Sequence, residues 1–160
     1  MPAAPQEPYK VARFLVEVDG LSGFHVSRVS GLKRMTAVDI VREGDAPQTE
    51  RATPGLTSFA PVVLERPRTD DKTFQKWADQ VSGRTGQGSA FRKMMAITLL
   101  TAAGQPAVRF KLFNCWPSKF VAFRFLNAES SEVVVERLVI QHEGWELDDA
   151  LVPPLPPAPQ

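Results

Sequence analysis

The sequence predicts a mainly β fold: an antiparallel β-sandwich or barrel with one flanking α-helix and a long protruding loop. Many short segments alternate apolar and polar residues with period 2, the pattern of half-buried strands. A single segment carries an apolar stripe at helical spacing. Between two strand-like segments lies a polar stretch with almost no large apolar residue. Many short strands with one helix are typical of a sandwich or a barrel.

The first strands are predicted from apolar residues at alternate positions. Residues 12–18 have apolar side chains at the even positions, and Asp19-Gly20 is a turn signal. Residues 24–26 continue the alternation, which predicts the returning strand. Further strands are predicted over residues 36–42 and 61–66.

Residues 44–57 form the polar stretch and predict a loop or an exposed hairpin. The stretch contains Gly and Pro together with charged residues, and it is long compared with the usual ~4–6 residues of a connection. Long loops in compact domains are usually functional or disordered. Because strand-like segments flank it, we expect it to project as an extended arm.

The helix is predicted to follow Thr69-Asp70-Asp71, which offer a capping side chain and acids for the positive helix end. Its apolar stripe has the spacing i, i+3, i+4 and i+7 and consists of Phe74, Trp77, Ala78 and Val81. Gly83 is predicted to end it.

Later strands are predicted over residues 91–100 and 108–116, with Pro117 ending the second. Residues 120–126 and 131–142 are predicted to complete the set of strands.

Composition restricts the function. The 160 residues hold 19 basic and 18 acidic side chains, and a net charge of +1 argues against a polybasic nucleic-acid binder. The one cysteine excludes an intrachain disulfide and a cysteine-rich zinc site. No apolar run approaches the length of a membrane span, so we expect no membrane anchor, and no signal peptide is expected either.

Proline-rich ends bracket the folded part. We expect an N-terminal arm over residues 1–10, a β domain over residues 11–151 and a proline-rich tail over residues 152–160. The tail favours extended polyproline II and cannot build a sheet or a helix.

Two motifs resemble catalytic or binding signatures but lack essential residues. His142-Glu143 opens like the metalloprotease motif H-E-x-x-H, yet Glu146 stands where the second histidine is needed. Residues 83–89 approach the spacing of a phosphate-binding loop, but Ser89 replaces the lysine. We therefore expect no metal, no cofactor and no enzyme activity.

Cys115 has no neighbouring histidine in the sequence, so we expect a buried structural cysteine rather than a nucleophile. The dense aromatic residues around it alternate with basic ones, as in platforms that stack single-stranded nucleic acid. A sheet core with a basic outer face is the favoured alternative, because the net charge is near zero. The aromatic residues are Phe110, Phe113, Trp116, Phe120, Phe123 and Phe125, and the basic ones are Arg109, Lys111, Lys119 and Arg124.

An ordered set of short motifs carries a family resemblance. They read F-L-V-E-V-D-G at 14–20, V-S-G-L at 29–32, V-R-E-G at 41–44, T-P-G-L at 53–56, V-L-E-R at 63–66, N-C-W-P-S-K-F at 114–120 and V-E-R-L-V-I-Q-H-E-G at 135–144. Together they run through nearly the whole folded part. This order resembles the tail tube proteins of contractile phages and of extracellular contractile injection systems.

The resemblance implies a structural protein that forms six-membered rings, stacked into an inner tube within a contractile sheath. Implied partners are further copies of the chain, the sheath protein and baseplate proteins, with protein cargo or phage DNA in the lumen. It also implies synthesis in the bacterial cytoplasm and assembly into a phage tail or an injection particle, with release from the cell left open.

The resemblance further implies that the arm bridges subunits within and between rings. The predicted interface residues are Arg42, Glu43, Gly44, Asp45, Glu50, Arg51, Thr53, Pro54 and Gly55. The alternative function is a monomeric β-barrel that binds a small ligand or an oligonucleotide.

Overall fold

The computed structural model describes residues 13–21, 23–42, 44, 49–83 and 91–148. Its strands are β1 (Arg13–Val18), β2 (Phe24–Val26), β3 (Arg28–Val29), β4 (Arg34–Val41), β5 (Arg51–Phe59), β6 (Val62–Pro67), β7 (Lys93–Leu100), β8 (Pro106–Val121), β9 (Val135–Gln141) and β10 (Trp145–Leu147). The helix α1 spans Thr73–Val81. The predicted N-terminal arm and proline-rich tail lie outside the described residues.

The large sheet closes into a barrel through β2 and β3. Its strand order is β2-β1-β7-β8-β9-β6-β3, every pair is antiparallel, and β10 adds to β8. Only Ser27 separates β2 from β3, and its backbone N–H and hydroxyl both donate to the Glu65 carbonyl of β6, at 2.9 and 3.0 Å. The two outermost strands of the sheet are therefore consecutive in the chain, and neither leaves a long open edge.

Side chains from the inward face of each strand fill the barrel. This follows from the alternation that the sequence displays, since Val16 and Val18 of β1 are buried while Glu17 is exposed. The core is Val16, Val18, Phe24, Val26, Val62, Leu64, Phe74, Trp77, Met95, Ile97, Leu112, Cys115, Leu138 and Ile140.

The helix α1 packs against β8 and contributes two aromatic rings to this core. Phe74 and Trp77 are fully buried, and Phe74 meets Phe24 edge to face with ring centroids 5.0 Å apart. The indole N–H of Trp77 donates to the Phe91 carbonyl at 2.9 Å. Gly83 follows the helix with φ of +77°, a conformation that favours glycine and ends the helix as predicted.

A buried ion pair connects the start of the helix to the barrel wall. Arg66 of β6 is bound to Glu136 of β9, and its guanidinium also donates to the Asp71 carboxylate at 2.9 Å. The guanidinium lies 4.1 Å above the Phe74 ring. Asp71 in turn accepts the backbone N–H of Thr73 at 2.9 Å, so it caps the helix from the residue before Lys72.

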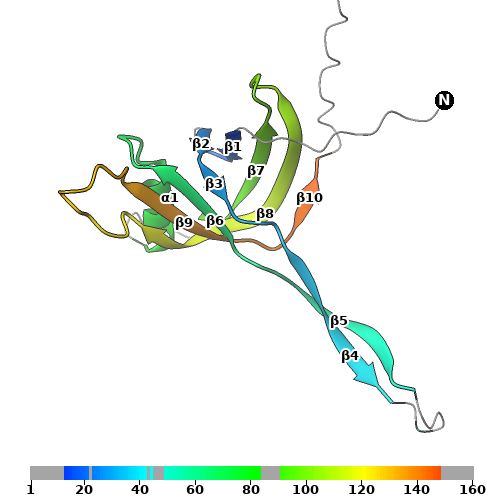
Figure 1. The fold of residues 1–160 in the computed structure, drawn as a ribbon. Coiled ribbons are helices and arrows are strands. Elements are labelled where there is room, and N and C mark those ends of the chain that lie inside the picture. The colour runs from blue at the N-terminus through cyan, green and yellow to red at the C-terminus, as the bar shows by residue number, and fades with distance from the viewer. Residues whose placement is uncertain (1–12, 22, 43, 45–48, 84–90, 149–160) are drawn as a thin grey trace, which may run out of the picture.

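Strands β4 and β5 form a separate two-stranded sheet, the β4–β5 hairpin. Figure 1 shows it projecting away from the barrel wall. The polar stretch of residues 44–57 is thus an exposed hairpin in its second half, because residues 51–57 belong to β5. Of the two predicted alternatives, a loop and an exposed hairpin, the loop is wrong for residues 51–57. Small and polar residues can form this strand because cross-strand pairing with β4 requires no burial.

The predicted fold class is confirmed: the structure is mainly β and antiparallel with one helix. The prediction that Pro117 ends its strand is wrong, because β8 continues to Val121. The register with β9 shifts between Pro117 and Lys119, and such a bulge tolerates a residue without an N–H donor. Residues 122–126 and 131–134 are not in strands, and β10 was not predicted.

Candidate interface site on the β4–β5 hairpin

The base of the hairpin is fixed to the β9–β10 turn. His142 is buried, and its Nε2 lies 2.9 Å from the Ala60 carbonyl, which can only accept, so Nε2 carries the proton. The Phe59 ring lies 5.7 Å from the His142 ring, and the Arg34 guanidinium lies 5.9 Å from the Trp145 ring. The hairpin is therefore anchored at its root.

His142 thus has a structural role in this anchor. Glu143, its neighbour in the metalloprotease-like motif, accepts a hydrogen bond from the Asn114 amide at 2.6 Å. Among the residues that the structure describes, no three His, Cys, Asp or Glu side chains gather to hold a metal ion.

One face of the hairpin is entirely apolar over its middle third. Val38 pairs with Pro54 and Ile40 pairs with Ala52, and because side chains alternate along a strand, all four lie on the same face. We call these residues the apolar face. Val38 is 67% exposed and Ile40 is 63% exposed. Thr36 and Thr57 continue this face toward the barrel, with their hydroxyls 3.0 Å apart.

The opposite face combines apolar and charged side chains. We call Met35, Asp39, Val41, Arg51 and Leu56 the mixed face, and Leu56 is 88% exposed. A Cβ at Gly55 would lie 2.7 Å from the Asp39 carboxylate, so glycine leaves the space that this carboxylate occupies. The register shift between Thr36 and Val38 lies beside Gly55 and Leu56.

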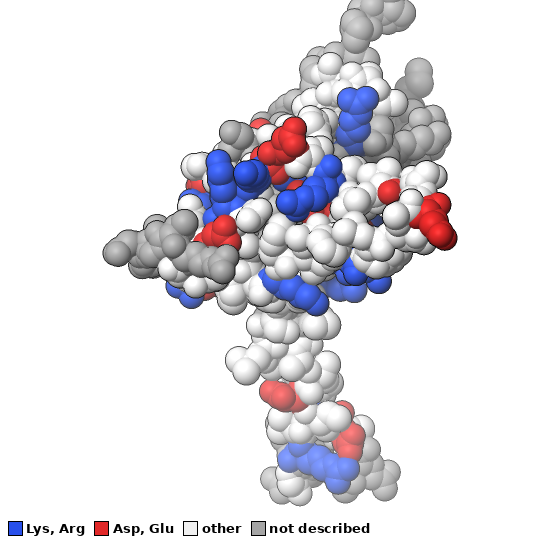
Figure 2. Space-filling view, turned by 90° about the vertical axis from the view of Figure 1, so that its left-hand side faces the viewer, with Lys and Arg blue, Asp and Glu red and all other residues white. Residues whose placement is uncertain are grey.

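The far end of the hairpin carries paired charges. The Arg42 guanidinium donates to the Glu50 carboxylate, with Nε at 3.0 Å, and both side chains are exposed. Figure 2 shows the projection mostly uncharged along its length, with charged residues gathered toward its end. An exposed ion pair of this kind contributes only ~0–1 kcal/mol.

The structure places the predicted interface residues at different levels of the hairpin. Arg42 and Glu50 pair with each other, Gly44 lies beyond β4, and Thr53 donates from its hydroxyl to the Asp39 carbonyl at 3.1 Å. Pro54 belongs to the apolar face, whereas Arg51 and Gly55 lie on the opposite side. Glu43 and Asp45 lie outside the described residues.

Sequence reasoning missed the exposed apolar side chains. It interpreted residues 38–41 as the flank of an arm and searched the polar residues for contacts. The missed residues are Met35, Val38, Ile40, Val41 and Leu56. The sequence did contain a signal for this exposure. A strand directly before a long polar stretch can pair only with the strand that follows the stretch, and both faces of such a hairpin are left uncovered.

The remaining candidates have structural environments. Cys115 is fully buried, and burial raises the pKa of its thiol to about 12, so the nucleophilic thiolate is strongly disfavoured. Arg109 and Lys111 lie near acids: Arg109 contacts Glu17 at 3.0 Å, and Lys111 lies 3.7 Å from Asp148. Phe123 and Phe125, however, are at least half exposed. Of the phosphate-loop candidate at 83–89, only Gly83 is described.

The match to a family model decides the family. The model for the T4-like virus tail tube protein gp19 matches residues 10–146. This chain belongs to the tail tube protein family. A comparison with curated proteins gives no match.

Solved structures show the same tail tube fold. A chain of the anti-feeding prophage baseplate has a TM-score of 0.74 and 22% identity, and the match covers 89% of this chain and 96% of that chain. A chain of the sheath-tube complex of the extracellular contractile injection system PVC has a TM-score of 0.75 and 18% identity, with 90% and 93% covered. Hcp1 from Flavobacterium johnsoniae has a TM-score of 0.55 and 16% identity, with 85% and 94% covered.

Proposed function

We propose that this tail tube protein is the repeating subunit of the inner tube of a contractile injection system or phage tail. Six copies form a ring, rings stack into a hollow tube, and the lumen carries protein cargo or DNA. The six-fold symmetrised baseplate of the anti-feeding prophage supports the ring size. The protein acts as a structural element and not as an enzyme.

The apolar face of the β4–β5 hairpin is the observation that carries this proposal. A two-stranded hairpin is at best marginally stable in water. Here the hairpin exposes Val38 and Ile40 on one face and Leu56 on the other, far from the core of its own barrel. Exposed apolar clusters mark interaction sites. A neighbouring subunit would cover these side chains and stabilise the hairpin at the same time.

The polymer amplifies each weak contact. An interface between different surfaces of identical subunits generates a closed ring or an open stack, and every subunit then repeats it. The predicted charged residues, from Arg42 to Arg51, would contribute at the rim of such contacts, while the apolar face supplies the buried centre.

The alternative of a ligand-binding barrel has less support. Val16, Met95, Leu112 and Leu138 fill the barrel interior and are fully buried, so this interior is a packed core.

The proposed partners follow from the relatives. The PVC chain comes from a sheath-tube complex, and the prophage chain comes from a baseplate. We propose a sheath protein around the tube and a baseplate at its end for this chain too. No helix among the described residues is long and apolar enough to cross a membrane. We propose synthesis in the bacterial cytoplasm and assembly into a phage tail or an injection particle.

Replacing residues 45–53 with a short Gly-Ser linker tests the role of the hairpin. We expect the melting temperature of the monomer, followed by circular dichroism, to be unchanged, because the barrel core lies elsewhere. Electron microscopy after nucleation on baseplate proteins is expected to show tubes for the unaltered chain and none for the variant. Variant tubes of normal length would contradict the proposed role of the hairpin.

A further inference from the structure

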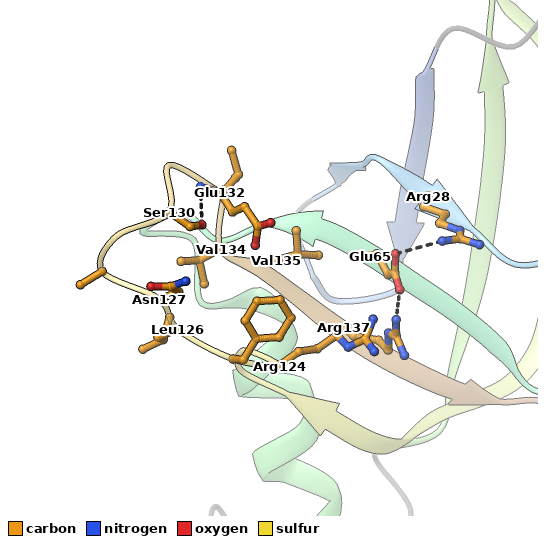
Figure 3. A pocket seen from close by; sticks show the side chains of 13 residues that line it. Arg28, Glu65, Arg124, Leu126, Asn127, Ser130, Glu132, Val134, Val135 and Arg137 are labelled. Carbon is orange, nitrogen blue, oxygen red and sulfur yellow. Dashed lines mark hydrogen bonds and ion pairs between the residues drawn. The ribbon is translucent and has the colours of Figure 1, made fainter.

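A groove lies beside the connection between β8 and β9, at the opposite end of the molecule from the hairpin (Figure 1). It encloses about 640 Å³, and the connection and the adjoining edges of β3, β6 and β9 line it. Figure 3 shows Leu126, Val134 and Val135 on the connection side and Arg28, Glu65 and Arg137 at the barrel.

The groove has large apolar side chains that remain mostly exposed in the described part of the chain. Phe125 is 65% exposed, Leu126 63% and Val133 69%. Among the described residues, the other large apolar side chains with an exposed fraction this high lie on the hairpin. Of the described residues, those of the hairpin and of this groove therefore leave the most extensive apolar surface in water.

Some charged side chains of the groove form ion pairs within the subunit, and others do not. Glu65 is bound to Arg137 and lies 3.9 Å from Arg28, so these charges are engaged within the subunit. Arg124 and Glu132 also line the groove, and within the described part of the chain neither side chain forms an ion pair.

The mixed face of the hairpin has the complementary pattern. Asp39 and Arg51 form no ion pair with any described residue, in contrast to Arg42 and Glu50. Arg51 pairs with Val41, two residues beyond Asp39 in the register, so both charges lie on one face. Thr57 lies on the opposite face with Thr36, so the adjacent Leu56 lies on the same face as the two charges. The mixed face and the groove thus each have one acidic and one basic side chain without an ion-pair partner among the described residues, next to exposed apolar side chains.

We propose that the mixed face of the β4–β5 hairpin docks into the β8–β9 groove of another copy of this chain. Asp39 faces Arg124, Arg51 faces Glu132, and Leu56 packs on the apolar side chains of the groove. Because the two surfaces lie at opposite ends of the subunit, the contact runs head to tail and repeats from copy to copy. This inference rests on the proposed tube function and assigns the hairpin its receptor.

Charge reversal with rescue tests the pairing. We expect Arg124→Glu and Asp39→Arg each to abolish tube growth on baseplate nuclei, while both monomers keep their melting temperature because both positions are exposed. The double variant Asp39→Arg/Arg124→Glu should restore growth, since opposite charges face each other again. Lys76→Glu on α1 reverses an exposed basic residue outside the groove, and we expect normal tubes from it.

A disulfide ladder provides an independent readout. In a Cys115→Ser background, Leu56→Cys/Val133→Cys should give a ladder of head-to-tail linked subunits when tubes are oxidised. Each single cysteine should give no ladder, and neither should Leu56→Cys combined with Met94→Cys, an exposed position outside the groove.

The outcomes separate the two proposals. Absence of tubes from the unaltered chain would overturn the tube function and this inference with it. Normal growth of the single charge reversals, or normal tubes without a ladder from Leu56→Cys/Val133→Cys, would overturn the groove as receptor and leave the tube function standing. Loss of growth without rescue would also overturn the pairing and would assign the groove to another partner, such as the sheath.

Discussion

The barrel and the hairpin use apolar residues in opposite ways. In the barrel, strands far apart in the sequence cover each other, and Val16, Leu64 and Ile140 are fully buried. In the hairpin, Val38 and Ile40 have the same alternation and chemistry but remain mostly exposed. Alternation therefore indicates a strand with an apolar face but does not identify what covers that face. Within the described part of the chain, the apolar side chains of the barrel are covered and those of the hairpin are not.

The largest expected effect comes from the barrel core. Trp77→Ala removes a fully buried indole and its hydrogen bond to the Phe91 carbonyl. We expect a loss of about 3–5 kcal/mol in unfolding free energy, a large share for a small domain. Urea denaturation would measure it, with Val81→Ala on the partly buried part of the helix as the milder control. A loss below that of the control would place Trp77 outside the core.

Glu136→Gln should have the next largest effect. The substitution leaves the Arg66 guanidinium buried with only Asp71 as its charged partner. Breaking a buried ion pair in this way is expected to cost about 3 kcal/mol in unfolding free energy. Glu17→Gln is the matched control because its pair with Arg109 is partly exposed, and we expect a cost below about 1 kcal/mol. Equal costs for both would contradict a special role of the buried pair.

Asp71 should give the barrel a smaller, pH-dependent stability. The hydrogen bond from the Thr73 hydroxyl, aided by the Thr73 N–H and Arg66, holds the pKa of Asp71 below its ordinary value of 3.8. Because the folded pKa is the lower one, this stabilisation is present above about pH 3.8 and is lost as the pH falls through the folded pKa. Melting temperatures of the protein and of Asp71→Asn should therefore converge at acidic pH. A constant difference would show that the charge is not involved.

The apolar face should show the smallest effect on the monomer. Val38→Ser/Ile40→Ser changes side chains that are already in water, so we expect the unfolding free energy to change by no more than about 0.5 kcal/mol. Tube growth, in contrast, should stop, because a subunit contact loses its apolar centre. Met94→Ser, an exposed apolar position on β7, is the control, and its tubes should be normal. A destabilised monomer would mean that the hairpin belongs to the barrel's own fold.

Much of the barrel could be predicted from the sequence because its signals are local. The alternation of β1, the turn at Gly20 and the stripe of Phe74 and Trp77 all agree with the structure. The prediction that the strand ends at Pro117 failed because a bulge accommodates a residue without an N–H. Such a bulge depends on the partner strand and cannot be inferred from the local sequence. The short strand β10 depends entirely on its pairing with β8.

The candidate site was harder to predict. The position of the projecting segment followed from its length and polarity, but burial cannot be inferred from alternation alone. The alternation at Val38 and Ile40 therefore predicted a strand but not the exposure of these side chains. Arg42 and Glu50, predicted as interface residues, pair with each other in the subunit. The groove brings Arg28 next to Arg124 and Glu132, which lie about 100 residues later in the sequence. The groove therefore becomes visible only once the barrel is closed.

Backbone hydrogen exchange of the monomer and the assembled tube tests the contrast between barrel and hairpin most directly. In the monomer, we expect the amides of β4 and β5 to exchange rapidly, while those of β7 and β8 are protected. In the tube, the amides of β4 and β5 should become as protected as those of β7, and the barrel should change little. Protection of the hairpin already in the monomer, or continued rapid exchange in the tube, would contradict the claim that a second subunit completes it.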